Sequence, residues 1–522
     1  MSTNPREGLV WDESGLEYEP QWASEPSIEA IEATCRRVLK LDPSDDCSVS
    51  FKAEGAFNKV YLVQHTSEQR WIFRVSLPVE PGKKTTGEVA TLSWLERHTG
   101  VPSPRVIAFD ATSKNDIGYE WILMTFIPGT LLHHKWRGLS MEAKAALTEK
   151  MAEYQAQIFN ASKFRTIGTL KDISLEDDAE LEIGQLVHIM FFLGPRYDLD
   201  IPRGPFRCSH DWLETFISII IKEQKKLLSE CSDSSSDSGS DSGSDSGSDS
   251  DSDDNSDDNS DEDSDEDSDD SSDSDDILDS PDSSDSDGIP DLADNPDLNE
   301  DLDSDSDSSS DSSSDSDDRD REYAKYMLRV AKMLLDLLPD IFPKTQAHLE
   351  RTVLVHGDLS ECNILVDDDG TVTGIVDWEC VSALPLWAAT SMPLFLKSVD
   401  RHAPPDRDYY ADADPEMEAE DRIREGDYYL ESEGKNPLYW DHLMQYEQTK
   451  LRKVYTDRLS ELCPAWGRAY ADDGLKRDFC EAIIRCDAGF SMWLRKVIEW
   501  VRSVDDGEFR TIKEIMEAGL VV

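Results

Sequence analysis

One stretch of the chain, Val353–Glu379, constrains the fold more than any other. It reads V-L-V-H-G-D-L-S-E-C-N-I-L-V-D-D-D-G-T-V-T-G-I-V-D-W-E, and its apolar runs predict short buried strands at Val353–Val355, Ile364–Val366 and Thr373–Val376. The D-D-D-G turn between the second and third runs predicts a hairpin. Three polar side chains lie at the ends of these strands: Asp358, Asn363 and Asp377.

The types and positions of these three residues are typical of a phosphoryl-transfer site. In such a site a loop aspartate accepts or orients the acceptor's hydroxyl proton, and a nearby asparagine binds one Mg²⁺. A strand-end aspartate then binds the metal that bridges the nucleotide phosphates. Oxygen ligands suit a hard cation such as Mg²⁺. Aspartate is also common in ordinary turns, but that alternative does not explain why all three residues fall at strand ends.

Two motifs in this stretch resemble a known family. They are H-G-D-L-S at residues 356–360, followed by Asn363, and I-V-D-W-E at residues 375–379. Together they look like the aminoglycoside phosphotransferase and choline kinase-like family, whose members have H-G-D where protein kinases have H-R-D. The chain is most similar to the fungal branch, which includes proteins similar to the mitochondrial-inheritance kinase-like protein of yeasts.

The resemblance implies an α+β, protein-kinase-like fold of two lobes. The N-lobe would be small and built on an antiparallel sheet, and the C-lobe would be mainly helical. The resemblance also implies ATP and Mg²⁺ as cofactors, with Asn363 and Asp377 as metal ligands. It gives His356 a supporting role in the catalytic loop and leaves the small-molecule acceptor unidentified.

In the N-lobe, alternating residues at Ser48–Ala53 and Val60–Gln64 predict a hairpin around the turn E-G-A-F-N-K. In kinase-like folds such a turn closes over the nucleotide phosphates, which its backbone N–H groups bind. Gly55, Phe57 and Asn58 are therefore candidate nucleotide contacts, and fungal members of the resembled family have similar turns. An ordinary hairpin turn is the alternative, because only one glycine is present.

The next predicted strand, Trp71–Val75, carries Arg74 where kinases place a phosphate-binding lysine. Arginine binds phosphate through two N–H groups, so we expect Arg74 to contact the α- and β-phosphates. An arginine on the strand surface is the alternative. Glu88, on a helix expected to run from Thr85 to His98, has two interpretations. It pairs with Arg74, as in kinases, or it closes a capping box with Thr85.

A further predicted strand, Trp121–Ile127, leads to the hinge of the resembled fold, where Thr125 and Ile127 are candidate adenine contacts. Apolar residues at helical spacing then predict a mainly helical lobe. Its expected helices are Met141–Phe159, Glu322–Leu338, Tyr439–Cys463 and Leu475–Val501, with others starting near Leu186 and Asp211. We expect the tryptophans of the later helices to pack in the core rather than line an acceptor pocket: Trp440, Trp466, Trp493 and Trp500.

Residues 231–320 form an acidic block of serine and aspartate with 35 Asp, 3 Glu, one Arg and no Lys. The block carries most of the chain's formal charge of −59. Such a segment cannot bury enough apolar surface to fold, so we expect a disordered insertion. An inert spacer is the simplest interpretation. A target for phosphorylation and a binding segment for a basic protein partner are the alternatives.

These patterns divide the chain into five expected parts. Residues 1–25 are expected to be loosely ordered, Ser27–Leu41 to form a helix and Asp406–Gly434 to be in part disordered or a loop. The parts are an N-terminal segment with one helix (1–44), the N-lobe (45–130), the first part of the C-lobe (131–230), the acidic insertion (231–320), and the rest of the C-lobe with the catalytic loop and the metal-binding strand (321–522).

Composition argues against several other classes of protein. The acidic charge disfavours nucleic-acid binding, and no apolar run reaches the roughly 18 residues of a membrane span. Nine scattered cysteines form no C-x-x-C pair, which fits a reducing compartment. The first residues lack the apolar core of a signal peptide. We therefore expect a cytoplasmic protein without a membrane segment, with a mitochondrial location as the alternative that the resemblance implies.

The sequence thus predicts an ATP- and Mg²⁺-dependent phosphotransferase that acts on a hydroxyl group of a small molecule, with Asp358 as the base or orienting group. The alternative is a nucleotide-binding pseudokinase or scaffold that presents the acidic block to partners. Arg74 and the single glycine favour that alternative, and the complete Asp358, Asn363 and Asp377 set opposes it. A protein kinase fits less well, because D-W-E stands where D-F-G would and no A-P-E-type segment follows.

Overall fold

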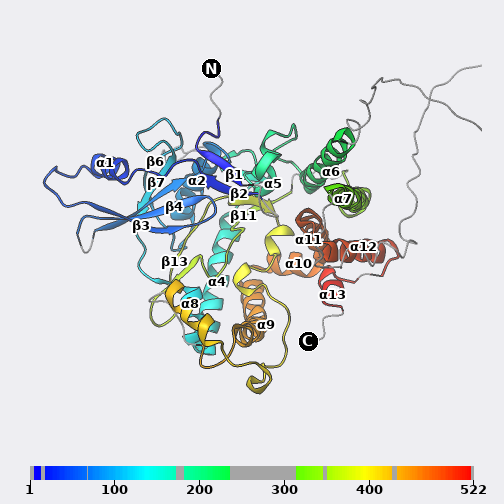
Figure 1. The fold of residues 1–522 in the computed structure, drawn as a ribbon. Helices are drawn as coiled ribbons and strands as arrows, with labels where there is room; N and C mark the ends of the chain where they lie inside the picture. Colours follow the sequence, from blue (N-terminus) through cyan, green and yellow to red (C-terminus); the bar gives the residue numbers. More distant parts are fainter. Residues whose placement is uncertain are drawn as a thin grey trace, which may run out of the picture. The chain divides into compact units, whose positions relative to one another are not determined.

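The structure is a computed structural model, drawn in Figure 1. It describes residues 5–12, 18–66, 69–171, 182–234, 313–344, 350–425, 432–508 and 510–518. Met1–Leu228 and Asp320–Val522 belong to one compact unit, and Ser229–Arg319 form the other. Most of the acidic insertion therefore lies outside the described residues, and the predictions about it stay predictions. At its two edges, residues 231–234 and 313–320 are helical.

The N-lobe is a five-stranded antiparallel sheet, as the fold class predicted. Its strands lie in the order β3 (Ser48–Glu54), β4 (Asn58–Gln64), β5 (Arg70–Ser76), β7 (Glu120–Thr125) and β6 (Val106–Asp110). Residues Glu54 and Lys59 pair across β3 and β4, so the turn E-G-A-F-N-K closes this hairpin. Helix α2 (Lys83–His98) packs against the sheet, and its buried residues include Val89, Leu92 and Leu95.

Residues near the N-terminus are more ordered than predicted. Strands β1 (Leu9–Asp12) and β2 (Glu19–Trp22) form an antiparallel hairpin, and helix α1 (Ile28–Leu39) follows it. Tyr119 attaches this segment to the sheet, because its hydroxyl donates to the Ser24 carbonyl at 2.8 Å. The prediction missed the hairpin because four-residue strands carry little periodicity.

The C-lobe is mainly helical, which confirms the second half of the predicted fold class. Its longer helices are α4 (Met141–Ala161), α6 (Ser209–Ser234), α7 (Ser313–Ile341), α9 (Pro437–Leu462), α10 (Pro464–Asp472), α11 (Gly474–Ala488) and α12 (Ser491–Asp505). Shorter helices are α3 (Leu132–Lys135), α5 (Ile189–Phe192), α8 (Pro415–Glu425) and α13 (Ile512–Glu517). Among the described helices, none has the length and apolarity to cross a membrane.

Two small sheets hold the predicted catalytic stretch within this lobe. One has the order β10 (Glu182–Ile183), β9 (Gly168–Lys171), β14 (Ser382–Pro385), β11 (Thr352–Val355). The other has the order β13 (Val372–Ile375), β12 (Ile364–Val366), β8 (Thr130–Leu131). All three predicted strands are therefore present, and β12 and β13 form the predicted hairpin. A buried apolar core packs these strands against α4 and α9.

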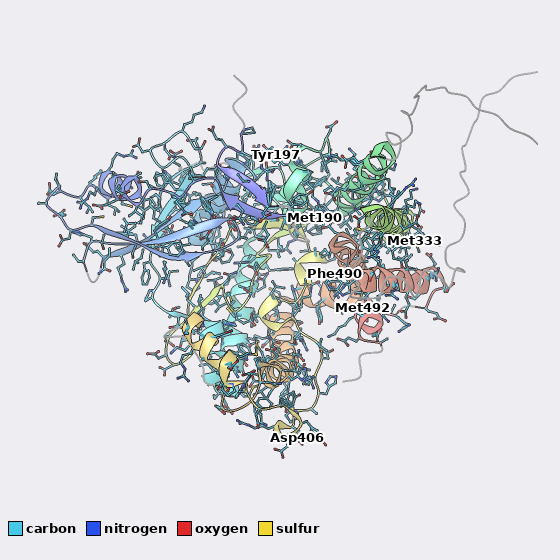
Figure 2. The ribbon with its side chains drawn as sticks, in the orientation of Figure 1. Met190, Tyr197, Met333, Asp406, Phe490 and Met492 are labelled. Atoms are coloured by element: carbon cyan, nitrogen blue, oxygen red, sulfur yellow. The ribbon has the colours of Figure 1, made fainter. Side chains whose placement is uncertain are left out.

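Two details of the C-lobe differ from the prediction. The helix expected at Leu475–Val501 is broken at Gly489, whose φ of +72° ends α11. The separate helix α12 then begins at Ser491, with Phe490 as its N-cap; Figure 2 labels Phe490 and Met492 on either side of this start. The helix expected near Leu186 is only the single turn α5.

Strand β9 lies against helix α2 at a point where the helix has a glycine. A Cβ atom added at Gly87 would stand 2.6 Å from Thr169 Cγ2 and 3.4 Å from the Leu170 carbonyl oxygen. The absence of a side chain therefore sets how closely α2 approaches a segment that joins the C-lobe sheet.

This close contact predicts the effect of a methyl group. Gly87→Ala should gain about 1 kcal/mol of helix propensity, yet lose about 1–3 kcal/mol to overpacking, so we expect net destabilisation. Thr169→Ser removes Cγ2 but keeps the hydroxyl that accepts the Val187 N–H, so the double variant should recover stability. Urea unfolding measures both effects. A Gly87→Ala protein as stable as the parent would contradict the contact.

Candidate active site

The loop between β11 and β12 brings two of the predicted catalytic residues together. Asn363 is only 8% exposed, and its Nδ2 donates to Asp358 Oδ2 at 3.0 Å and to the Asp358 carbonyl at 2.7 Å. The amide nitrogen is thereby committed to Asp358, which leaves Oδ1 of Asn363 as the atom able to bind a cation. The Asp358 carboxylate itself is exposed, as a group that must meet a substrate hydroxyl requires.

The β12–β13 hairpin brings Asp377 to the same loop. Ile364 pairs with Ile375, and beyond the strands the Val376 N–H donates to the Asn363 carbonyl at 3.0 Å. Asp377 is the next residue, with a φ of +62° in the left-handed region that aspartate tolerates better than most residues. The backbone of the residue before Asp377 is therefore hydrogen-bonded to the predicted catalytic loop.

His356 ties the loop to this turn. Its Nε2 lies 3.0 Å from the Val376 carbonyl, and its ring stands edge-on to Trp378 with 4.7 Å between the ring centroids. Burial lowers the pKa of His356, so the ring is neutral near pH 7 and donates from Nε2. His356 therefore connects the loop that contains Asp358 to the backbone of the turn before Asp377.

Arg74 reaches this turn from the N-lobe. Its guanidinium forms an ion pair with Glu88 of α2, and both side chains are at least 94% buried. Its Nη1 also lies 3.2 Å from Asp377 Oδ1. The ion-pair interpretation of Glu88 is therefore correct, and the capping-box alternative is wrong, because α2 begins at Lys83 with Gly82 as its N-cap.

Two further charged residues, Lys84 and Glu379, complete the cluster. Neither was predicted from the sequence to be a site residue. Lys84 Nζ lies 2.5 Å from Glu379 Oε2, and Asn58 Nδ2 donates to the same oxygen at 2.8 Å. Glu379 belongs to the D-W-E motif. Lys84 precedes Glu88 by four residues and so shares its helix face, a signal that the spacing K-T-T-G-E contained.

Charge is unevenly shared in this cluster. Three carboxylates meet two cations, and the Asp377 side chain is 35% exposed whereas Glu379 is 12% and Glu88 2% exposed. Burial, and next the charge of Glu379, raise the pKa of Asp377. Burial acts in the same direction on Glu379, but Lys84 and then Arg74 outweigh it and lower that pKa. The remaining negative charge therefore lies on the carboxylate that solvent reaches.

This donor set fits Mg²⁺ held partly by a nucleotide. Within the described ranges, no three His, Cys, Asp or Glu side chains converge as a metal cluster. Mg²⁺ is usually bound through one or two carboxylates together with substrate phosphates. Asp377 offers one carboxylate, Asn363 one amide oxygen, and the excess negative charge of the cluster favours a cation.

The other predicted nucleotide contacts have separate surroundings. The Gly55 N–H donates to the Asn58 carbonyl at 2.9 Å and closes the turn, and Phe57 stands edge-on to Phe192 at 5.4 Å. At the hinge, the Thr125 N–H and hydroxyl are both bonded to the Arg105 backbone. Ile127 packs against Gly374 of β13, close enough that a Cβ there would lie 2.8 Å away. Their roles as phosphate and adenine contacts stay predictions.

A cavity of about 400 Å³ lies beside the catalytic loop. His133 lines this cavity. The backbone N–H of His133 donates to the Glu361 carbonyl in that loop at 3.1 Å. Its lining includes the largely buried ion pair of Lys144 and Glu447, 2.7 Å apart. Trp440 lines this cavity, so its predicted place in the core is wrong, whereas Trp466 and Trp500 are fully buried as expected.

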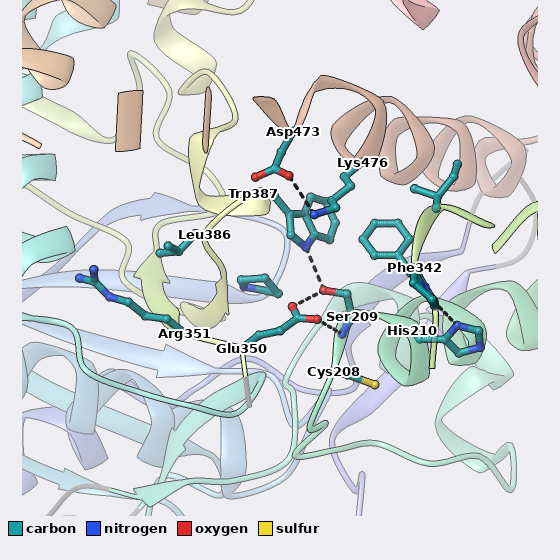
Figure 3. A pocket seen from close by; sticks show the side chains of 13 residues that line it. Cys208, Ser209, His210, Phe342, Glu350, Arg351, Leu386, Trp387, Asp473 and Lys476 are labelled. Carbon is teal, nitrogen blue, oxygen red and sulfur yellow. Dashed lines mark hydrogen bonds and ion pairs between the residues drawn. The ribbon is translucent and has the colours of Figure 1, made fainter. Parts of the chain in front are cut away.

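A smaller cavity of about 210 Å³ lies at the start of α6 (Figure 3). Its polar atoms bond to one another: the Ser209 hydroxyl donates to Glu350 at 2.5 Å and accepts from Trp387 Nε1 at 2.8 Å. Glu350 also accepts the Ser209 N–H at 3.1 Å. These contacts cap the N-terminus of α6, so Ser209, Glu350 and Trp387 stabilise the fold at this point.

Known proteins match parts of this chain. A model of the phosphotransferase enzyme family matches residues 48–177 and 287–389. A subtelomeric hrmA-associated cluster protein of Aspergillus fumigatus is 33% identical over 177 residues, which are 32% of this chain and 34% of that protein. Altered inheritance of mitochondria protein 9, mitochondrial, of Meyerozyma guilliermondii is 26% identical over 154 residues, 27% of this chain and 25% of that protein. The chain thus matches only about a third or less of the length of these relatives.

Solved structures also resemble the chain over most of its length. The ADP-bound aminoglycoside phosphotransferase APH(2'')-Ib is 10% identical with a TM-score of 0.36, and the alignment covers 94% of this chain and 96% of that chain. The gentamicin complex of APH(2'')-IIa is 11% identical with a TM-score of 0.36, covering 94% and 99%. Both TM-scores are below 0.5, so these likenesses carry no argument about the fold or the activity.

The contacts of His356 lead to a testable expectation. His356→Phe keeps a ring against Trp378 but loses the hydrogen bond to Val376, so it should lower the free energy of unfolding by about 1–2 kcal/mol. It should also weaken Mg-ADP binding, because the bond fixes the backbone beside Asp377. Urea unfolding and calorimetry measure the two effects. The exposed His402 provides the control His402→Phe, and unchanged stability in His356→Phe would contradict the assigned role.

Proposed function

We propose that the chain transfers the γ-phosphoryl group of ATP to a hydroxyl group of a small molecule, with Mg²⁺ as cofactor. The match of residues 48–177 and 287–389 to the phosphotransferase enzyme family supports this proposal. One observation carries the proposal. Asn363 is hydrogen-bonded both to Asp358 and to Val376, the residue before Asp377, and the paired Arg74 contacts Asp377. The turn interpretation of these aspartates does not account for that convergence.

Each residue has a role in this proposal that follows from its surroundings. Asp358 is the exposed carboxylate and accepts or orients the acceptor's hydroxyl proton. Asn363 Oδ1 and the Asp377 carboxylate hold the metal, which when bound neutralises phosphate charge. Arg74, kept in place by Glu88, presents a positive charge beside Asp377, where the nucleotide phosphates would meet the metal.

The cavity beside the catalytic loop is the proposed acceptor pocket. Its volume of about 400 Å³ lies within the range of small-molecule sites. Trp136 and Trp440 contribute aromatic surface, and the buried Lys144–Glu447 pair contributes fixed charges. Incubation of the purified protein with labelled ATP and a panel of hydroxyl-bearing metabolites would identify the acceptor.

The location of the protein belongs to the same proposal. The yeast relatives carry the word mitochondrial in their names, so we include the mitochondrion beside the cytoplasm. Imaging of the full chain with a C-terminal fluorescent tag distinguishes the two compartments.

Two substitutions separate binding from turnover. Asp377→Asn removes a metal ligand, so the Kd for Mg-ATP should rise about tenfold or more. Asp358→Asn should change that Kd by less than about threefold and lower kcat by about 10²–10⁴-fold, the usual contribution of a general base. Calorimetry gives the Kd, and ATP consumption with the identified acceptor gives kcat.

The control is Asp369→Asn, in the exposed D-D-D-G turn, which should match the parent in both assays. If Asp377→Asn binds Mg-ATP as tightly as the parent, the metal assignment is wrong. If the parent binds Mg-ATP and transfers phosphate to no acceptor, the pseudokinase or scaffold alternative replaces the enzyme proposal.

A further inference from the structure

The ammonium group of Lys84 is almost completely buried. It lies in the first turn of α2 and is 2% exposed, among the largest fully buried side chains of the protein. A buried cation is costly unless charged and polar partners replace its hydration. Nζ has two such partners at short range: Glu379 Oε2 at 2.5 Å and Asn58 Oδ1 at 2.9 Å.

These two partners belong to different parts of the proposed nucleotide site. Glu379 follows the metal ligand Asp377 by two residues, and Asn58 follows Phe57 at the end of the nucleotide turn. The partners also bond to each other, because Asn58 Nδ2 donates to Glu379 Oε2 at 2.8 Å. Asn58 is fixed further by the Ser76 hydroxyl, which donates to Oδ1 at 2.8 Å. Lys84 thus stands at the junction of turn, helix and metal-binding strand.

Arg74 cannot take over this position without leaving its own. Its guanidinium is 3.7 Å from Glu379, but it already pairs with Glu88 and with Asp377. If Lys84 were neutral, Glu379 would be a buried carboxylate with Arg74 as its nearest cation. The attraction would draw Arg74 from Asp377, the residue proposed to hold the metal.

We propose that Lys84 is a positioning residue for the Mg-nucleotide: by binding Glu379 and Asn58 together, it sets the nucleotide turn at a fixed distance from Asp377. The inference rests on the proposed function, because it concerns the same site. It differs from a purely structural salt bridge in one respect. A structural bridge adds stability alone, whereas a positioning contact also changes nucleotide affinity in protein that remains folded.

The neighbouring residue offers a matched control. Lys83 lies in the same turn of α2, but its side chain is 49% exposed and pairs with Glu80 at 2.7 Å, away from the site. Lys83→Met and Lys84→Met therefore remove the same charge from adjacent helical positions. Only the second removes it from the Glu379 and Asn58 contacts.

The experiment measures two quantities on each variant of the full chain: the Kd for Mg-ADP by calorimetry and the thermal unfolding midpoint of the protein without nucleotide. Lys84→Met should raise the Kd at least tenfold, and Lys83→Met should leave it within about twofold of the parent. Glu379→Gln should also raise the Kd. The double variant Lys84→Met with Glu379→Gln should bind no more weakly than Glu379→Gln alone, because Lys84 acts through that carboxylate.

Each outcome either supports or overturns the positioning role of Lys84. A lower unfolding midpoint with an unchanged Kd in Lys84→Met overturns the inference in favour of a structural bridge. Independent, multiplying losses in the double variant also overturn it. If Lys84→Met does not fold, the double variant, which buries no unpaired charge, decides by its comparison with Glu379→Gln. A parent protein that binds no Mg-nucleotide would instead refute the proposed function, so the two failures are distinguishable.

Discussion

Five charged side chains meet where strand β5, helix α2 and the turn after β13 converge: Arg74, Lys84, Glu88, Asp377 and Glu379. Placing them in a largely buried site is favourable only if each charge has a partner. Arg74 and Lys84 satisfy the two most buried carboxylates, Glu88 and Glu379, and the remaining charge lies on Asp377. The same interactions join the N-lobe to the catalytic stretch, so the requirement to pair buried charges sets the geometry of the site.

The local part of this arrangement could be read from the sequence. Asp358, Asn363 and Asp377 lie within one loop and one hairpin, and strand periodicity with turn residues fixes their proximity. The long-range part could not. Asn58 and Glu379 are 321 residues apart, and nothing local to Lys84 distinguishes it from the exposed Lys83 beside it. Which of two adjacent lysines is buried depends on the rotation of α2 against the sheet, a tertiary property.

The errors of the prediction have a common physical origin. The prediction followed the apolar spacing across Gly489, which instead adopts a positive φ and ends the first helix. Trp440 was assigned to the core from its chemistry, although aromatic rings serve cavity walls equally well. In both cases the residue type allowed more than one structure, and packing against distant parts of the chain decided between them.

Helix α2 is held at successive positions along its length, and this has a consequence for nucleotide binding. Lys84 attaches it to Glu379 in the turn after β13, Gly87 lets β9 approach it closely, and Glu88 attaches it to β5. A helix fixed at three points on neighbouring turns has little freedom to rotate away from the site. In the proposed nucleotide site, affinity would therefore depend on how well these attachments hold Asp377 and the turn at residues 55–58 in place.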